Sequence, residues 1–160
     1  KIYKSPKDLA VCYQTVAHYL SSIKREDNWW LGNLVYAGKI MGLCSYGNVN
    51  EQWLPHFEEY YRRKPDGLNY LQYLKELGEQ TGLSFDMGNR MSGQLGWDVA
   101  KTSQIAFENV FMELAQPFLD QFPNLPLILV GGCALNILLN TKLHQELNRP
   151  VFVPPNSSLS

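Results

Sequence analysis

Hydrophobic residues in the first half of the chain recur with the period of an α-helix. Together with Ser-Pro and Gly signals at the ends, this pattern predicts helices over residues 5–23, 34–43, 50–63 and 68–81. The last two flank the turn residues 65–67, so we expect a helical hairpin. Residues 84–96 keep no period and are rich in Gly, Met and polar residues, which predicts a mobile loop.

The second half of the chain combines one long helical pattern with two short apolar runs. Apolar positions from Val99 to Phe118 predict a helix that begins near Gln94 or Asp98, faces a core along its length, and ends or kinks at Pro117. Two strands, over 127–130 and 151–153, flank a predicted helix over 134–147. A strand, helix, strand order favours parallel pairing through a right-handed crossover.

These elements predict an α/β fold, rich in helix, with a small parallel or mixed sheet. We divide the chain into three segments of one larger domain: a first helical segment, a helical hairpin with its loop, and a long helix with the strand–helix–strand unit, over residues 1–48, 49–93 and 94–160. The chain begins at Lys1 without Met and ends soon after a strand, so we expect it to be a piece of a longer polypeptide.

Charge and cysteine content narrow the classes of function. Fourteen Lys and Arg residues stand against fifteen Asp and Glu residues without a basic cluster, which argues against a nucleic-acid partner. The three cysteines are far apart in the sequence, so they support neither a disulfide framework nor a Cys-x-x-Cys metal site, and a reducing cytoplasmic compartment is expected. There is no long apolar run and no leader pattern, so we expect no membrane partner.

A glycine pair follows the first predicted strand. Gly131 and Gly132 interrupt an apolar run, and the helix after them carries Asn136 and Asn140 on one face. Backbone amides at such a turn, with amide side chains beside them, are typical of sites that bind a phosphate or a ribose. A tight strand-to-helix turn without a ligand fits the same pattern, and this alternative stays open.

Lys39 lies between two glycines inside an apolar stretch. A lysine in such surroundings needs an anionic partner, and a nucleotide phosphate would serve, although a lysine that extends to solvent from a helix end fits as well. The isolated histidines and cysteines, including Cys133 after the glycine pair, predict structural roles and no metal site. Helical spacing predicts core packing more than an acceptor pocket for six aromatic residues: Trp53, Phe57, Tyr60, Tyr61, Tyr70 and Tyr73.

Three segments, taken in order, resemble the O-carbamoyltransferases that act on nodulation factors and antibiotics. Residues 38–47 (GKIMGLCSYG) are similar to that family's Gly-Lys-x-Met-Gly-Leu-Ala-x-Tyr-Gly motif. Residues 99–108, which include Gln104 and Glu108, resemble its Asp-x-Ala-x-x-x-Gln-x-x-x-Glu helix. Residues 130–136 (VGGCALN), followed by Asn140 and by VFVPP at 151–155, are similar to its Ala-Gly-Gly-x-Ala-Leu-Asn-x-x-x-Asn element and Val-x-Pro-Pro strand. Three ordered motifs are more specific than any one of them.

The resemblance implies part of an actin-like, ribonuclease-H-like ATPase fold. It implies an enzyme that uses ATP to transfer a carbamoyl group from carbamoyl phosphate, through carbamoyl-adenylate, to a hydroxyl of a small-molecule acceptor. Carried over by motif, Gly131, Gly132 and Asn136 would hold the nucleoside and its phosphate, and Lys39 would lie near the same site. Gln104 and Glu108 would support the helix packed behind it, and the resemblance assigns no catalytic residue.

The chain departs from the family pattern in its metal ligands. It has no His-x-x-x-His pair, and the segment 156–160 has no Asp where the family places an Asp-x-Gly. The adenylate-forming domain of the family is also absent, so we expect a divalent metal only in the full-length protein and no activity from this chain alone. Two alternatives stay open: a protein that transfers threonylcarbamoyl to tRNA, and a nucleotide-binding module without catalysis.

Overall fold

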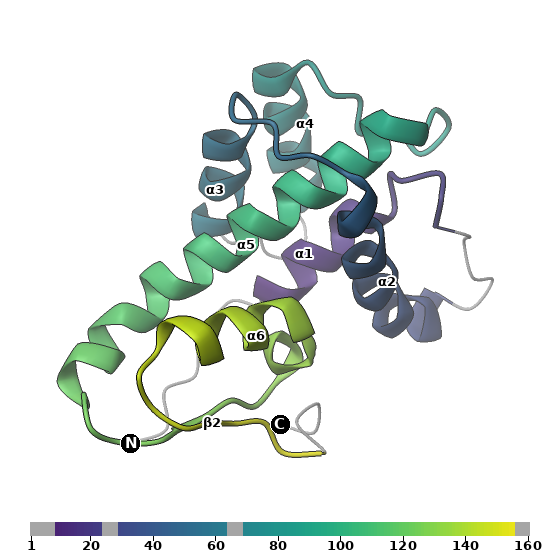
Figure 1. Cartoon of the computed structure of the whole chain (residues 1–160). Helices are drawn as coiled ribbons and strands as arrows, with labels where there is room; N and C mark the ends of the chain where they lie inside the picture. The colour runs from purple at the N-terminus through teal and green to yellow at the C-terminus, as the bar shows by residue number, and fades with distance from the viewer. Residues whose placement is uncertain (1–8, 24–28, 64–68, 156–160) are drawn as a thin grey trace. The chain divides into compact units, whose positions relative to one another are not determined.

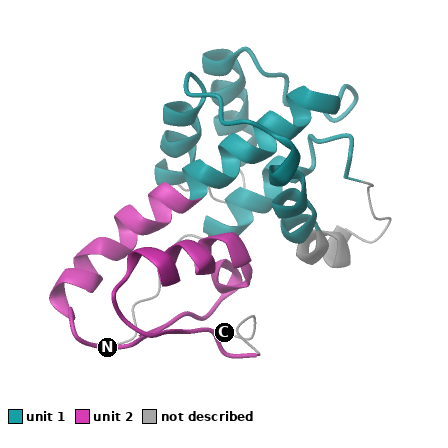
Figure 2. Cartoon of the chain, in the orientation of Figure 1, with its two compact units in different colours: residues 1–107 teal, residues 108–160 magenta. Residues whose placement is uncertain are grey.

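The computed structural model describes residues 9–23, 29–63 and 69–155, with side chains for all of these except 29–35. The chain forms two compact units, residues 1–107 (unit 1) and residues 108–160 (unit 2), which Figure 2 shows in different colours. The boundary falls inside the long helix α5 (Gly93–Gln121). The three-segment division made from the sequence stays a prediction.

Unit 1 is helical. It contains α1 (Leu9–Ala17), α2 (Trp29–Leu43), the 3₁₀ turn η1 (Cys44–Tyr46), α3 (Leu54–Arg63), α4 (Tyr70–Thr81) and the first half of α5 (Figure 1). Helix α1 packs against α2 and α3, and α3 packs against α4, which confirms the predicted hairpin. Gly82 ends α4 with a φ of 73°, as the sequence predicts for a helix stop. The turns predicted around residues 24–28 and 65–67, and the helix start at Ser5, lie outside the described residues.

The core of unit 1 contains hydrogen-bonded polar groups as well as apolar side chains. The Tyr13 hydroxyl on α1 donates to Gln104 Oε1 on α5 at 2.5 Å, and Tyr61 Oη on α3 lies 2.6 Å from Ser103 Oγ on α5. All four side chains are buried, so each polar group needs such a partner. Burial raises the pKa of Tyr61 above its ordinary value, so the phenol stays neutral. Phe57, Tyr60 and Tyr61 pack in this core, which confirms core packing for these three aromatic residues.

Unit 2 consists of the second half of α5 followed by a strand–helix–strand unit. Strand β1 (Leu127–Ile128) is followed by the 3₁₀ turn η2 (Gly132–Leu135), α6 (Ile137–Glu146) and β2 (Val151–Phe152). The strands pair in parallel, with Leu127 opposite Val151 and Ile128 opposite Phe152. This confirms the predicted parallel sheet and the helix-rich α/β class.

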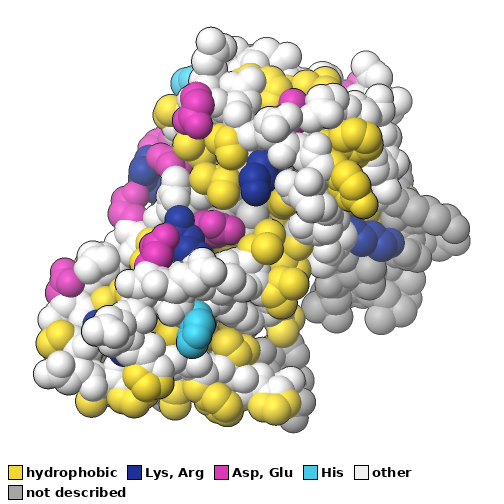
Figure 3. All heavy atoms as spheres, viewed as in Figure 1, with side chains coloured by type: hydrophobic (Ala, Val, Ile, Leu, Met, Phe, Trp, Pro, Cys, Tyr) yellow, Lys and Arg dark blue, Asp and Glu magenta, His cyan; other side chains and the backbone are white. Residues whose placement is uncertain are grey.

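One side of the sheet in unit 2 carries exposed apolar side chains. The strand residues alternate between half-buried and exposed, and Ile128 and Phe152 are exposed partners in the register. Hydrophobic side chains gather along the lower border of this unit in Figure 3. Parallel sheets are usually covered on both faces. In the described part of the chain, no element covers the face of the sheet that carries Ile128 and Phe152.

Several predicted boundaries are wrong, and the end of α5 shows why. The sequence predicts that the helix ends or kinks at Pro117, yet it does not end there and continues to Gln121. Continuation buries Leu119, and Arg149 donates to the carbonyl oxygens of Leu119 and Phe122 at 3.2 and 2.7 Å. These contacts offset a proline cost of about 3 kcal/mol. The predicted core face fails over the same stretch, because Leu114 and Phe118 are exposed.

Other boundaries differ by one or two turns. Helix α1 ends at Ala17, although the predicted apolar face, which includes Leu20 and Ile23, is buried. Helix α2 already begins at Trp29. The loop predicted over 84–96 gives way to α5 at Gly93, and Met91 within it is buried and bonded through its N–H to the Tyr19 carbonyl at 2.8 Å. Mobility of this loop stays a prediction.

Within the described ranges, none of the helices is long and apolar enough to cross a membrane.

Candidate nucleotide site and its supports

The turn after β1 requires glycine at its first position. Gly131 has φ 89° and ψ −179°, a conformation that is essentially restricted to glycine. Its carbonyl accepts a hydrogen bond from the N–H of Ala134 at 3.0 Å, which starts η2. Glycine is therefore required at position 131 by the backbone conformation of the turn.

Two asparagines hold this turn against α6. Asn136 is the N-cap of α6, and its Oδ1 accepts from the N–H of Leu139 at 2.9 Å. Asn140 Nδ2 donates to the carbonyl of Ala134 at 2.8 Å. The helix start that the sequence predicts, at Ala134, is wrong. Asn136 is the N-cap, and α6 therefore begins at Ile137. Gly131–Asn136 is called the glycine turn below.

The glycine turn leaves backbone donors available at the start of α6. The N–H groups of Ile137 and Leu138 are the first two of the helix and form no hydrogen bond within the described part of the chain. Helix N-termini favour anions because these donors and the helix dipole point outward. Asn140 Oδ1 is also buried without a hydrogen-bond partner beside this turn, and as an acceptor it can take a donor such as a hydroxyl but not a phosphate oxygen. The two N–H donors alone fit a phosphate at the start of α6.

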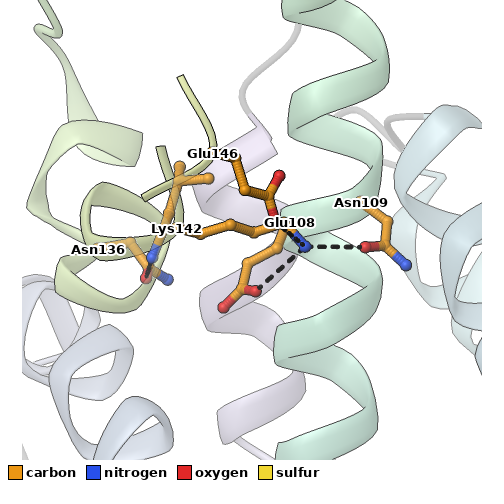
Figure 4. A network of polar contacts seen from close by, with 6 residues as sticks. Glu108, Asn109, Asn136, Lys142 and Glu146 are labelled. Carbon is orange, nitrogen blue, oxygen red and sulfur yellow. Dashed lines mark hydrogen bonds and ion pairs between the residues drawn. The ribbon is translucent and has the colours of Figure 1, made fainter. Parts of the chain in front are cut away.

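A lysine on α6 connects that helix to α5 within unit 2 (Figure 4). Lys142 Nζ lies 3.9 Å from Glu108 Oε2 and 3.7 Å from Glu146 Oε1, and it donates to Asn109 Oδ1 at 3.4 Å. The side chain of Glu108 is only 9% exposed, and that of Lys142 is 25% exposed. These four residues are called the Lys142 network. The supporting role predicted for Glu108 stays a prediction.

Residues 38–47 lie in unit 1 and form the end of α2 with η1. Lys39 is half-buried, and its Nζ lies 5.9 Å from the centre of the Tyr36 ring. Gly47 approaches α5 so closely that an added Cβ would stand 2.0 Å from the carbonyl oxygen of Trp97. Lys39 and the glycine turn belong to different units, so the prediction that they share one site stays a prediction.

A family model described as carbamoyltransferase N-terminus matches residues 3–158, nearly the whole chain. The chain belongs to the carbamoyltransferase N-terminal family. No curated protein and no solved structure matches it. The resemblance inferred from three ordered motifs is thereby confirmed, and carbamoyl transfer is the general chemistry of this family.

The described residues of this carbamoyltransferase-family chain do not fit a metal ion. Across residues 9–23, 29–63 and 69–155, no three His, Cys, Asp or Glu side chains come together as ligands. Cys12, Cys44 and Cys133 form no disulfide among the described residues.

The sequence motifs do not predict a role for Lys142. Its signal is a lysine between Leu139 and Leu143, two residues that are fully buried in the structure, with Glu146 one helical turn later. A cation beside a buried helix face needs an anionic partner, and that requirement points to an acid on a neighbouring helix. The partner Glu108, 34 positions earlier, comes only from the fold.

Proposed function

We propose that this chain supplies part of the nucleotide site of an ATP-dependent carbamoyltransferase. The observation that carries the proposal is the glycine turn, with Gly131 in a glycine-only conformation and donor N–H groups at Ile137 and Leu138. Family membership supports carbamoyl transfer in general. ATP, carbamoyl phosphate and a hydroxyl of a small-molecule acceptor are the proposed substrates, and the complete protein is proposed to have an actin-like ATPase fold.

The residues of this chain would act by binding and orientation. Gly131 and Gly132 let the backbone approach a phosphate, and Asn136 fixes the start of α6 so that its N–H groups face the anion. Lys39 would add a positive charge near the phosphates. In the proposed transfer, the acceptor oxygen attacks the carbamoyl carbon of the adenylate, the bond from that carbon to the AMP oxygen breaks with its electrons left on AMP, and the hydroxyl proton passes to water. Such group transfer benefits most from positioning of the two reactants.

The test is nucleotide binding by the full-length natural protein that contains this sequence. Calorimetric titration with ATP should show binding, and Gly131→Ala should weaken it by about tenfold or more because the turn must rearrange. Gly82→Ala is the matched control, since Gly82 also has a positive φ and lies outside the site. No ATP binding by the unmodified protein, or equal binding by Gly131→Ala, would overturn the proposal.

A nucleotide-binding module without catalysis is the second candidate. The observation that favours it is the glycine turn, because N–H donors at the start of α6 can hold an anion without any catalytic side chain. This candidate predicts that the full-length protein binds ATP but transfers no carbamoyl group from carbamoyl phosphate to any hydroxyl acceptor. Release of AMP that depends on both carbamoyl phosphate and acceptor would exclude it.

A further inference from the structure

The Lys142 network connects α5 with the helix that carries the glycine turn. Lys142 lies within 4 Å of two carboxylates, Glu108 and Glu146, and of the amide oxygen of Asn109. We propose that Lys142 is a positioning residue. Through Glu108 it fixes the orientation of α6 on α5, and it so directs the N–H groups of Ile137 and Leu138, which follow the glycine turn, toward a bound phosphate. This role rests on the proposed function of the turn.

The turn moves with α6 because hydrogen bonds join them. Asn140 Nδ2 holds the carbonyl of Ala134, and Asn136 caps the helix through Leu139. Lys142 is six residues after Asn136 on the same ten-residue helix, about 9 Å along its axis. A change in the orientation of α6 at Lys142 is therefore transmitted to the turn.

The other end of the turn is held independently. Strand β1 is paired with β2 through the N–H groups of Leu127 and Leu129, which donate to Pro150 and Phe152 at 2.8 and 3.0 Å. The turn thus spans two supports, the sheet on one side and α6 on the other. Only the α6 side depends on Lys142, so its loss should alter the geometry of the turn without releasing β1.

Apolar burial and the ion pair do different work on α6. Leu139 and Leu143 are fully buried and keep the helix attached, but the hydrophobic effect has no direction. At 3.9 Å the contact of Lys142 with Glu108 is an ion pair without a hydrogen bond, and the directional contact of Lys142 is the hydrogen bond to Asn109 Oδ1 at 3.4 Å, also on α5. Because Glu108 is mostly buried, its contact with Lys142 is screened less than an ion pair on the surface. Loss of Lys142 should therefore disorient α6 while the helix stays folded.

The experiment measures hydrogen exchange and ATP binding on the full-length natural protein. Lys142→Met is compared with Lys142→Arg, which keeps the charge, and with Glu108→Gln. Lys75→Met is the matched control, since Lys75 forms an exposed ion pair with Glu79. We expect Lys142→Met to speed exchange at the amides of Ala134, Asn136 and Leu139 and to weaken ATP binding, each by about tenfold. Far-ultraviolet circular dichroism should stay unchanged.

Conservative rescue separates positioning from folding. Lys142→Arg should restore most of the protection and affinity, and the double variant Glu108→Gln/Lys142→Met should lose less than the two single variants together. Exchange at the three amides equal to that of the unmodified protein would overturn the inference. If the unmodified protein binds no ATP, the proposed function fails, but the exchange rates still decide whether Lys142 orients the turn.

Discussion

Two segments of this chain that match family motifs, 38–47 and 131–136, use glycine for different physical reasons. Gly47 has φ −100° and ψ 164°, which any residue adopts, but a Cβ there would collide with the backbone of Trp97. At Gly131 the backbone conformation itself requires glycine. Gly38 and Gly42 have neither reason, since a Cβ at either meets nothing within 4 Å. A shared composition therefore conceals two different constraints, and two of these glycines are under neither of them.

The largest expected effect is that of Gly47→Ala. The added Cβ would lie 2.0 Å from Trp97 O and 2.4 Å from Trp97 C, so η1 and the start of α5 must separate. The neighbours are backbone atoms that cannot rotate away, and we expect a loss of about 3 kcal/mol in the free energy of unfolding. Urea denaturation followed by tryptophan fluorescence measures it. A loss below about 0.5 kcal/mol would show that space is not what Gly47 provides.

Gly131→Ala should come next, with a loss of about 2 kcal/mol from the strained backbone. Unlike Gly47, this position is also proposed to face the ligand, so ATP binding should fall more than stability explains. Gly131→Asn is the informative companion and should lose as much stability, because Asn tolerates a positive φ in the left-handed helical region but not at a ψ of −179°. If both variants unfold like the unmodified protein, then φ 89° is not what makes glycine necessary at this turn.

Sequence patterns predicted the packing faces better than the ends of the elements. The apolar face of α1 and the parallel strand pair follow directly from spacing, because burial imposes the period. The end of α5 does not, since the carbonyls beyond Pro117 are satisfied by Arg149, about thirty positions away. For the site, the glycine pair and Asn136 carry local signals, whereas the partnership of Glu108 and Lys142 depends on which helices meet.

Two substitutions of Asn136 distinguish its role as the N-cap of α6 from its proposed role in ligand binding. Asn136→Ala removes the acceptor of the Leu139 N–H and should cost about 1 kcal/mol. Asn136→Asp keeps an N-cap oxygen and should unfold at nearly the same urea concentration as the unmodified protein, but it adds a negative charge beside the proposed phosphate. Calorimetry should then show weaker ATP binding by Asn136→Asp at unchanged stability. Equal binding would limit Asn136 to capping.

Gly42→Ala should have the smallest effect and the opposite sign. Gly42 lies in the last turn of α2, exposed, with nothing within 4 Å of an added Cβ. Alanine has the higher helix propensity, so we expect a gain of about 0.8 kcal/mol, measured by urea denaturation, and Gly38→Ala should behave alike. A loss of stability would mean that this face of α2 is already in close contact. The full-length protein could instead gain stability and lose carbamoyl transfer. That result would mean that Gly38 and Gly42 allow a substrate or another segment to approach, whereas Gly47 is needed for packing against Trp97.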